Sequence, residues 1–265
     1  MPKAAKLALF IVTLVFFVSL ISPYIGLLDP NEINLDAIRQ APSMSHPFGT
    51  DNKGRDLFAR VIAGAKVSIG VAFSASTVAA SLGLTVGLMA GYLGGKVDRV
   101  LMTLVDFILS FPSLLFAIAV SIVLPSGLFS VMIAIAAVGW TSFARLVRGI
   151  VLSVKDMPYV DAARTLGCSD LRILVRHIAP QCITGVIVMM GIKLGGFILT
   201  EATLGFLGLG LQPPQPSWGA MVSAGRNHIL TAPWMALFPG LTIFLTVLCL
   251  NMLGESLRKA YQMTE

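Results

Sequence analysis

The stretch YVDAARTLGCSDLRILVRHIAP, residues 159–180, combines regular apolar spacing with charges inside an otherwise apolar chain. Its apolar residues recur at the spacing of one helical face: Tyr159, Ala162, Ala163 and Leu166. Asp161, Arg164 and Thr165 lie elsewhere on the same predicted helix. A small-residue face flanked by opposite charges suits docking into a groove on another protein, because alanine permits close approach and the charges can set the register.

The neighbouring residues predict two short helices joined by a glycine. Pro158 suits the first turn of a helix, with Asp156 just before it as a candidate cap. Gly167 suits the end of this helix, and Ser169 suits the N-cap of a second helix that runs toward Pro180. Spacing alone leaves two interpretations open: the helices cover the end of a bundle, or they dock on a partner.

The composition indicates what must position this stretch. The chain has 265 residues, of which 56% are hydrophobic and 12% are charged, whereas an average soluble domain carries about 25% charged residues. The charges are clustered and leave long apolar runs between them. This pattern predicts an integral membrane protein with an all-α fold.

Six segments are long and apolar enough for membrane spans, since a helix needs roughly 20 residues to cross the bilayer. They lie at about 7–28, 67–91, 101–124, 129–144, 183–209 and 236–254. We interpret the first as part of an anchor at 1–28 rather than a signal peptide, because no small-residue cleavage site follows it.

The distribution of Lys and Arg predicts the orientation. Most of them fall on the side that holds both termini and the 145–180 loop, which the positive-inside rule places in the cytoplasm. The predicted organisation has four parts: the anchor 1–28, an extracytoplasmic segment 29–66, a core 67–258 and a tail 259–265. The net charge of +6 reflects the loop bias and does not indicate nucleic-acid binding.

The loop also carries a family resemblance. The order Asp161-Ala162-Ala163, three residues, Gly167, twelve residues, Pro180 resembles the EAA loop of ATP-binding-cassette importer permeases. Three departures are visible: Asp161 stands at the usual Glu, His177 at the usual Ile and Ala179 at the usual Leu. Three further segments resemble the C-type permeases for dipeptides, oligopeptides and nickel: 46–72, 200–226 and 233–258.

This resemblance implies a type I (MetI-like) importer permease with six transmembrane helices, in a bacterial or archaeal plasma (inner) membrane. In such importers the loop forms coupling helices that dock on ATPase subunits. The implied partners are a homologous permease, two ATPases and an extracytoplasmic substrate-binding protein. ATP and Mg would be bound by the ATPases, with no cofactor or metal held by this chain.

The motifs agree that this chain is not an enzyme. The sequence contains no G-x-x-x-x-G-K-[ST] phosphate loop, no H-E-x-x-H and no G-x-S-x-G. The energy for transport is therefore expected from partner subunits. A stand-alone secondary transporter is the alternative of a different class, although no self-similarity between the two halves of the chain supports it.

Three ionisable residues fall within or near the predicted spans. Lys193 lies ten residues into the fifth span, ~15 Å deep, and Glu201 lies ~12 Å further along the axis. Asp106 lies near the inner face, where Arg99 or an Arg of the loop can neutralise it. Two interpretations stay open for Lys193 and Glu201: they line the translocation path or its gate, or they form buried pairs that lock the bundle.

Small residues recur at every fourth position of the second span: Ala75, Ala79, Gly83, Gly87 and Gly91. Such a ridge allows a second helix to approach closely in lipid. We expect it to pack within this chain rather than against the partner permease.

Outside the spans, residues 55–65 predict an amphipathic helix that lies along the membrane surface. Its charged residues Arg55, Asp56 and Arg60 are candidates for contact with a binding protein, as is Trp218 in the later loop. Trp218 and Trp234 also fit the interfacial aromatic belt, which is the expected role.

The substrate is predicted from the resemblance to be a di- or oligopeptide, with nickel or a nickel chelate as the alternative. His46 and His228 both fall on the predicted outer side, but two distant histidines without a third ligand do not define a metal site.

Overall fold

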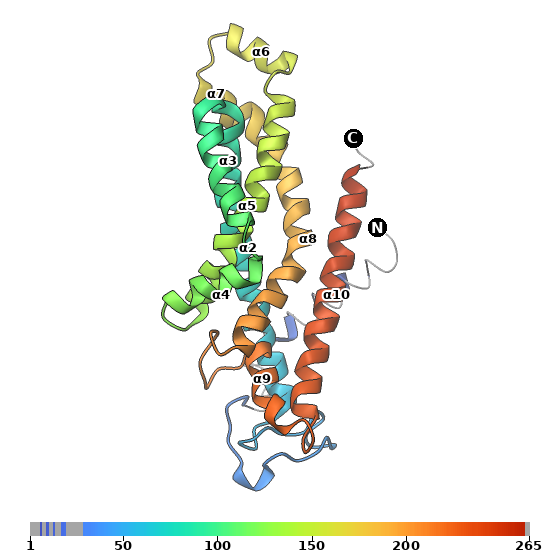
Figure 1. The fold of residues 1–265 in the computed structure, drawn as a ribbon. Coiled ribbons are helices and arrows are strands. Elements are labelled where there is room, and N and C mark those ends of the chain that lie inside the picture. Colours follow the sequence, from blue (N-terminus) through green and yellow to red (C-terminus); the bar gives the residue numbers. More distant parts are fainter. Residues whose placement is uncertain (1–5, 7–8, 11–12, 14–16, 20–28, 263–265) are drawn as a thin grey trace.

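The computed structural model describes residues 29–262, together with residues 6, 9, 10, 13 and 17–19. Within this part the chain is helical and forms no β-sheet, which confirms the predicted all-α class. The α-helices are α2 (Leu57–Leu93), α3 (Gly95–Leu109), α4 (Ser113–Val123), α5 (Leu128–Val154), α6 (Pro158–Thr165), α7 (Asp170–Ile173), α8 (Ala179–Phe206), α9 (Trp218–Gly225) and α10 (Trp234–Gln262). The long helices run between one end that carries α6 and another that carries α9 (Figure 1).

Helix α2 begins at Leu57, where the Asp56 carboxylate caps the Ala59 N–H at 2.7 Å. It continues without a break for 37 residues, about 56 Å at 1.5 Å per residue. The prediction of a separate interfacial helix at 55–65 is therefore wrong, because the same apolar residues form the first turns of the spanning helix. A length beyond the ~30 Å hydrocarbon core leaves turns of α2 outside the bilayer.

The predicted span at 101–124 is broken. Helices α3 and α4 meet at an angle of 93°, and Pro112 is the residue that precedes α4. Proline has no N–H and disfavours a helical conformation of the residue before it, so a straight helix cannot continue through this position. Figure 1 shows α4 turned sideways from the axis of α3.

The 145–180 loop is shorter than predicted, because helices enter it from both sides. Helix α5 continues to Val154, ten residues beyond the predicted end of the fourth span. At the other side Asp170–Phe206 forms one continuous helix through a π-helical segment at Leu174–Ile178. Pro180 therefore does not end a separate second helix, since the wider π turn before it accommodates the missing N–H.

The α2 ridge packs against α5, as predicted. A Cβ atom placed on Gly87 would lie 2.6 Å from Val147 Cβ and 2.7 Å from the Ala144 carbonyl oxygen. Gly83 and Gly91, one helical turn before and after Gly87, lie similarly close to α5. Close approach of the two backbones therefore requires glycine at these positions.

Helices α2, α5 and α10 and the continuous helix Asp170–Phe206 are each long and apolar enough to cross a membrane. The bent α3–α4 pair can supply a fifth span. Of the predicted first span, 7–28, only residues 9, 10, 13 and 17–19 are among the described residues. The predicted tail, 259–265, is the last turn of α10 as far as Gln262.

Candidate functional site: the α6–α7 loop and the cavity at Lys193

Helix α6 and its glycine form a well-defined turn. Pro158 is the first helical residue, as predicted, but Met157 rather than Asp156 occupies the N-cap. At the C-terminus the Gly167 N–H donates to the Arg164 carbonyl and the Cys168 N–H to the Ala163 carbonyl. This is a Schellman motif, and Gly167 adopts the left-handed φ of +79° that the motif requires.

Ser169 occupies the N-cap of α7, as predicted, although its side chain makes no capping hydrogen bond. Asp161 accepts a 2.9 Å ion pair from Arg164 along the exposed surface of α6. Thr165 donates its hydroxyl to the Asp161 carbonyl. The Asp161 contacts stay within α6, whereas the Arg164 side chain also lies close to the Tyr92 hydroxyl at the end of α2.

The predicted apolar face of α6 is divided between the interior and the surface. Ala163 is buried together with Val160, whereas Ala162 is exposed. Tyr159 is 39% exposed and Leu166 is 84% exposed. We call the exposed apolar residues of α6, α7 and the π-helical segment the loop face, comprising Tyr159, Ala162, Leu166, Leu171 and Val175.

The loop is fixed to the bundle by buried and polar contacts. Val160 and Ile173 are fully buried in the main hydrophobic core. The Tyr92 hydroxyl, at the end of α2, donates a 2.6 Å hydrogen bond to the Asp170 carboxylate. Near Tyr92 in the sequence, Asp98 of α3 forms an ion pair with Arg148 of α5. The pair has two contacts, and the longer of the two is 2.6 Å.

A cavity of about 620 Å³ lies between the α3–α4 bend, α5, α8 and α10. The half-buried Lys193 lines it and donates a 3.2 Å hydrogen bond to the Ser142 hydroxyl. Thr200 and Asn251 add further polar side chains, and Phe111 contributes to the apolar part of the wall.

The two other predicted path residues lie elsewhere. Asp106 is exposed and pairs with Arg145 at 2.6 Å, which confirms the expectation that an Arg of the predicted loop neutralises it. Glu201 is 2% exposed and lies beside Ser68 of α2. Glu201 does not line the Lys193 cavity. Neither residue pairs with Lys193.

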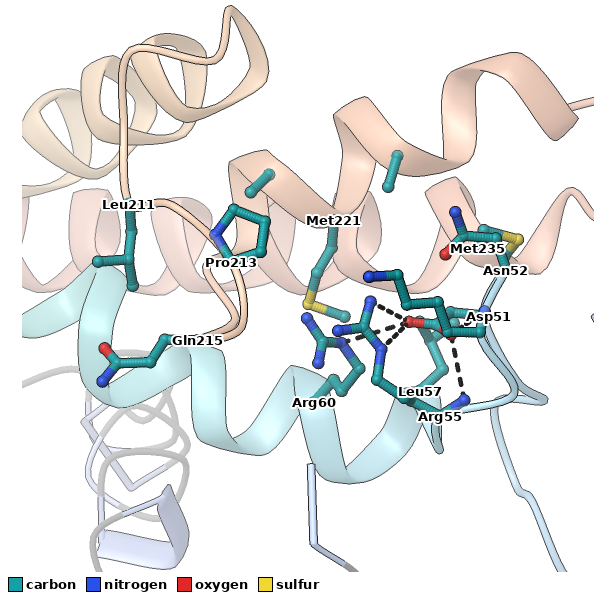
Figure 2. Close-up of a pocket in the computed structure, with 13 residues that line it drawn as sticks. Asp51, Asn52, Arg55, Leu57, Arg60, Leu211, Pro213, Gln215, Met221 and Met235 are labelled. Carbon is teal, nitrogen blue, oxygen red and sulfur yellow. Dashed lines mark hydrogen bonds and ion pairs between the residues drawn. The ribbon is translucent and has the colours of Figure 1, made fainter. Parts of the chain in front are cut away.

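At the α9 end, charged residues surround a smaller cavity of about 180 Å³. Asp51 accepts 2.7 Å contacts from Arg55, and the Arg60 guanidinium lies 3.6 Å from the same carboxylate oxygen. Figure 2 shows both guanidinium groups directed at Asp51. Arg60 also donates to the Pro30 carbonyl at 2.7 Å.

The predicted partner-facing residues of this end are therefore turned into the chain. Arg55, Arg60 and Asp56 are buried, and Asp56 accepts a 2.8 Å contact from His46. Trp218 is fully buried and donates its indole N–H to the Val61 carbonyl at 2.9 Å, so its predicted place in an aromatic belt is wrong. Packing of α9 on α2 encloses these side chains.

Sequence reasoning missed Tyr92, Ser142 and Asp51. Tyr92 and Asp170 are 78 residues apart, and Ser142 and Lys193 are 51 residues apart, so no local pattern connects them. The Asp51–Arg55 pair had a detectable signal, because opposite charges stand four residues apart directly before an apolar helix.

Residues 83–262 match the family of binding-protein-dependent transport system inner membrane components, and the chain belongs to it. It is a permease subunit of an ATP-binding-cassette importer, a multi-pass inner membrane class whose ATPases are separate subunits.

Individual relatives cover nearly the whole chain. The chain is 40% identical over 257 residues to the glutathione transport system permease protein GsiD of Pectobacterium atrosepticum, covering 97% of this chain and 84% of the relative. It is 42% identical, with the same coverage, to GsiD of Escherichia coli O6:K15:H31.

Solved structures show the same fold. The inward-facing MetNI methionine transporter matches with a TM-score of 0.61 at 16% identity, over 77% of this chain and 97% of that chain. An amino acid ABC transporter crystallised with histidines matches with a TM-score of 0.58 at 17% identity, over 77% and 94%. These likenesses confirm the predicted type I architecture.

Proposed function

We propose that this permease imports di- or oligopeptides, forms half of the translocation pathway and couples to its ATPases through residues 156–180. The observation that supports this proposal most directly is the loop face, an exposed apolar surface at one end of the molecule. The opposite side of the loop is buried in the hydrophobic core through Val160 and Ile173. Such a surface on a rigid base suits insertion into a groove of a partner. The peptide assignment is supported by the relatives, whose names specify glutathione, a tripeptide, and do not favour nickel.

Each loop residue has a role in this proposal. Tyr159, Ala162 and Leu166 enter the partner groove, while the Asp161–Arg164 pair sets the register. Ala163 holds α6 on the bundle. The remaining residues shape the loop, and they are Gly167, Ser169 and Pro180.

The assembly comprises this chain, a homologous permease, two ATPases that bind ATP and Mg, and an extracytoplasmic binding protein. The α6 end then faces the cytoplasm together with both termini, and the α9 end faces the binding protein. Lys193 lies on the translocation path. A charged side chain within a membrane span is energetically unfavourable, and such residues typically line the pathway of a substrate or ion. Glu201 stabilises the packing of α8 on α2, which is the interpretation its burial supports.

Affinity purification of this chain from its native membrane in mild detergent tests the assembly. Recovery of an ATPase, a homologous permease and a binding protein that carries a peptide is the expected result. Recovery of this chain alone, in a preparation that still transports peptide, contradicts the coupling role.

A matched pair of variants tests the loop itself. Gly167 and Gly149 are both exposed with open space around them, but only Gly167 has a positive φ. Gly167→Val strains the turn by about 1–3 kcal/mol and is expected to abolish ATP-driven uptake. Gly149→Val should leave uptake near the wild-type rate. Equal uptake by both variants, at equal amounts in the membrane, overturns the coupling assignment.

A further inference from the structure

Among the described residues, Lys193 forms no ion pair with a carboxylate. Its ammonium group donates to one neutral partner, Ser142, at 3.2 Å. Among the residues that line the cavity, none carries a carboxylate. A lysine in a membrane span is expected to face a charged partner or a wet cavity, since its insertion is unfavourable.

None of the carboxylates that lie near the cavity along the neighbouring helices pairs with Lys193. Glu255, four residues after the lining Asn251 on α10, pairs with Arg258 at 2.8 Å. Asp106, three residues before the cavity wall begins on α3, pairs with Arg145 at 2.6 Å. Glu201, eight residues after Lys193 on α8, is buried beside Ser68 of α2 and does not line the cavity. Within the described part of the chain, the charge on Lys193 is therefore unbalanced.

The cavity has the dimensions and lining of a ligand site. Its volume of about 620 Å³ lies within the roughly 300–1,000 Å³ range of small-molecule pockets. Polar side chains from three elements line the same cavity: Ser113 at the start of α4, Ser142 on α5, and Thr200 on α8. The apolar remainder, including Phe111 and Phe197, can contact side chains of varied shape.

We propose that Lys193 binds a carboxylate group of the peptide as it crosses this cavity. This inference rests on the proposed function, because it assigns the chemical group of the substrate that the path recognises. An arriving carboxylate replaces the neutral Ser142 acceptor with a charged one, and the resulting ion pair is stronger in a low-dielectric site. Only the ammonium group is required for this recognition, so peptides of different sequence share it through their common carboxylate.

The test uses the complete importer, with its binding protein, in proteoliposomes. The probes are one tripeptide with a free C-terminal carboxylate and the same tripeptide as its C-terminal amide, both chosen for measurable wild-type uptake. Lys193→Met is compared with wild type for each probe. Because the binding protein is the same in both preparations, its own preference cancels when the two variant-to-wild-type ratios are compared.

The expected result is a loss of about tenfold or more for the carboxylate probe, as for removal of one charge-assisted hydrogen bond, with little change for the amide. Lys193→Arg should retain most of the discrimination. The control Lys66→Met removes a cation that lines a different cavity and should leave both ratios unchanged.

The outcomes separate this inference from the proposed function. Equal losses for the two probes overturn the inference and assign Lys193 to packing, or to a carboxylate of a partner subunit. If no tripeptide, free or amidated, shows ATP-dependent uptake by the wild-type importer when the probes are selected, the proposed function is overturned instead. Basal ATPase activity of Lys193→Met, measured in the same vesicles, shows whether the complex has assembled.

Discussion

The Tyr92 hydroxyl and the Asp170 carboxylate are joined by a 2.6 Å hydrogen bond that connects the end of α2 to the first turn of α7. This contact joins α2, which packs closely on α5, to the proposed coupling loop. The loop is therefore joined to α2 by a polar contact, in addition to the burial of Val160 and Ile173 in the hydrophobic core.

Removal of this hydroxyl tests the connection. Tyr92→Phe is expected to lower peptide transported per ATP hydrolysed by a few fold, with a loss of stability of only about 1 kcal/mol, because the bond is exposed. Transport and hydrolysis measured together in proteoliposomes check this. The control is Thr103→Val, which removes an exposed hydroxyl whose hydrogen bond stays within α3. Equal effects of the two variants would contradict the prediction.

The glycine ridge makes a prediction about stability. Gly87→Ala brings a methyl group within 2.7 Å of α5 and should lower the free energy of unfolding by about 1–3 kcal/mol. Gly70→Ala, on the same helix with open space around it, should be neutral or slightly stabilising, since alanine favours helix by up to about 1 kcal/mol. Unfolding temperatures in detergent compare the two, and similar values would exclude tight α2–α5 packing.

Asp51 balances two buried guanidinium groups at the α9 end. Asp51→Asn leaves Arg55 and Arg60 without a counter-charge and should destabilise the fold by about 3–5 kcal/mol, as for one partner lost from a buried ion pair. Asp36→Asn, at an exposed position of the 3-10 helix Leu35–Ala37, provides the matched control. Protease sensitivity of the α9 end measures the effect, and unchanged sensitivity would show that the charges are satisfied without Asp51.

A substitution of Glu201 distinguishes a role in helix packing from a role in transport. One carboxylate oxygen of Glu201 is buried without a hydrogen-bond partner. Glu201→Gln should therefore preserve transport and change stability by no more than about 1 kcal/mol, because a buried amide is less costly than a buried charge. Uptake assays and thermal unfolding check this. A large loss of uptake with an intact fold would contradict the packing role and support a place for Glu201 on the translocation path.

The sequence by itself determined the class, the spans and the local turns of this protein. Hydropathy acts residue by residue, so apolar runs located four described spans and the bent fifth. Pro158 and Gly167 mark the ends of α6 because fixed or positive φ values are properties of single residues. The spacing of the α2 ridge likewise indicated close packing before its partner was known.

Only the tertiary structure decided which side chains face inward and which meet each other. The amphipathic pattern at 55–65 fits a surface helix, but packing of α9 on α2 buries Arg60 and Trp218. The Lys193 cavity depends on the bend before α4 and on contacts between residues 51 positions apart. Such contacts depend on how whole helices are arranged, and the short-range signals that set a turn or a span carry no information about them.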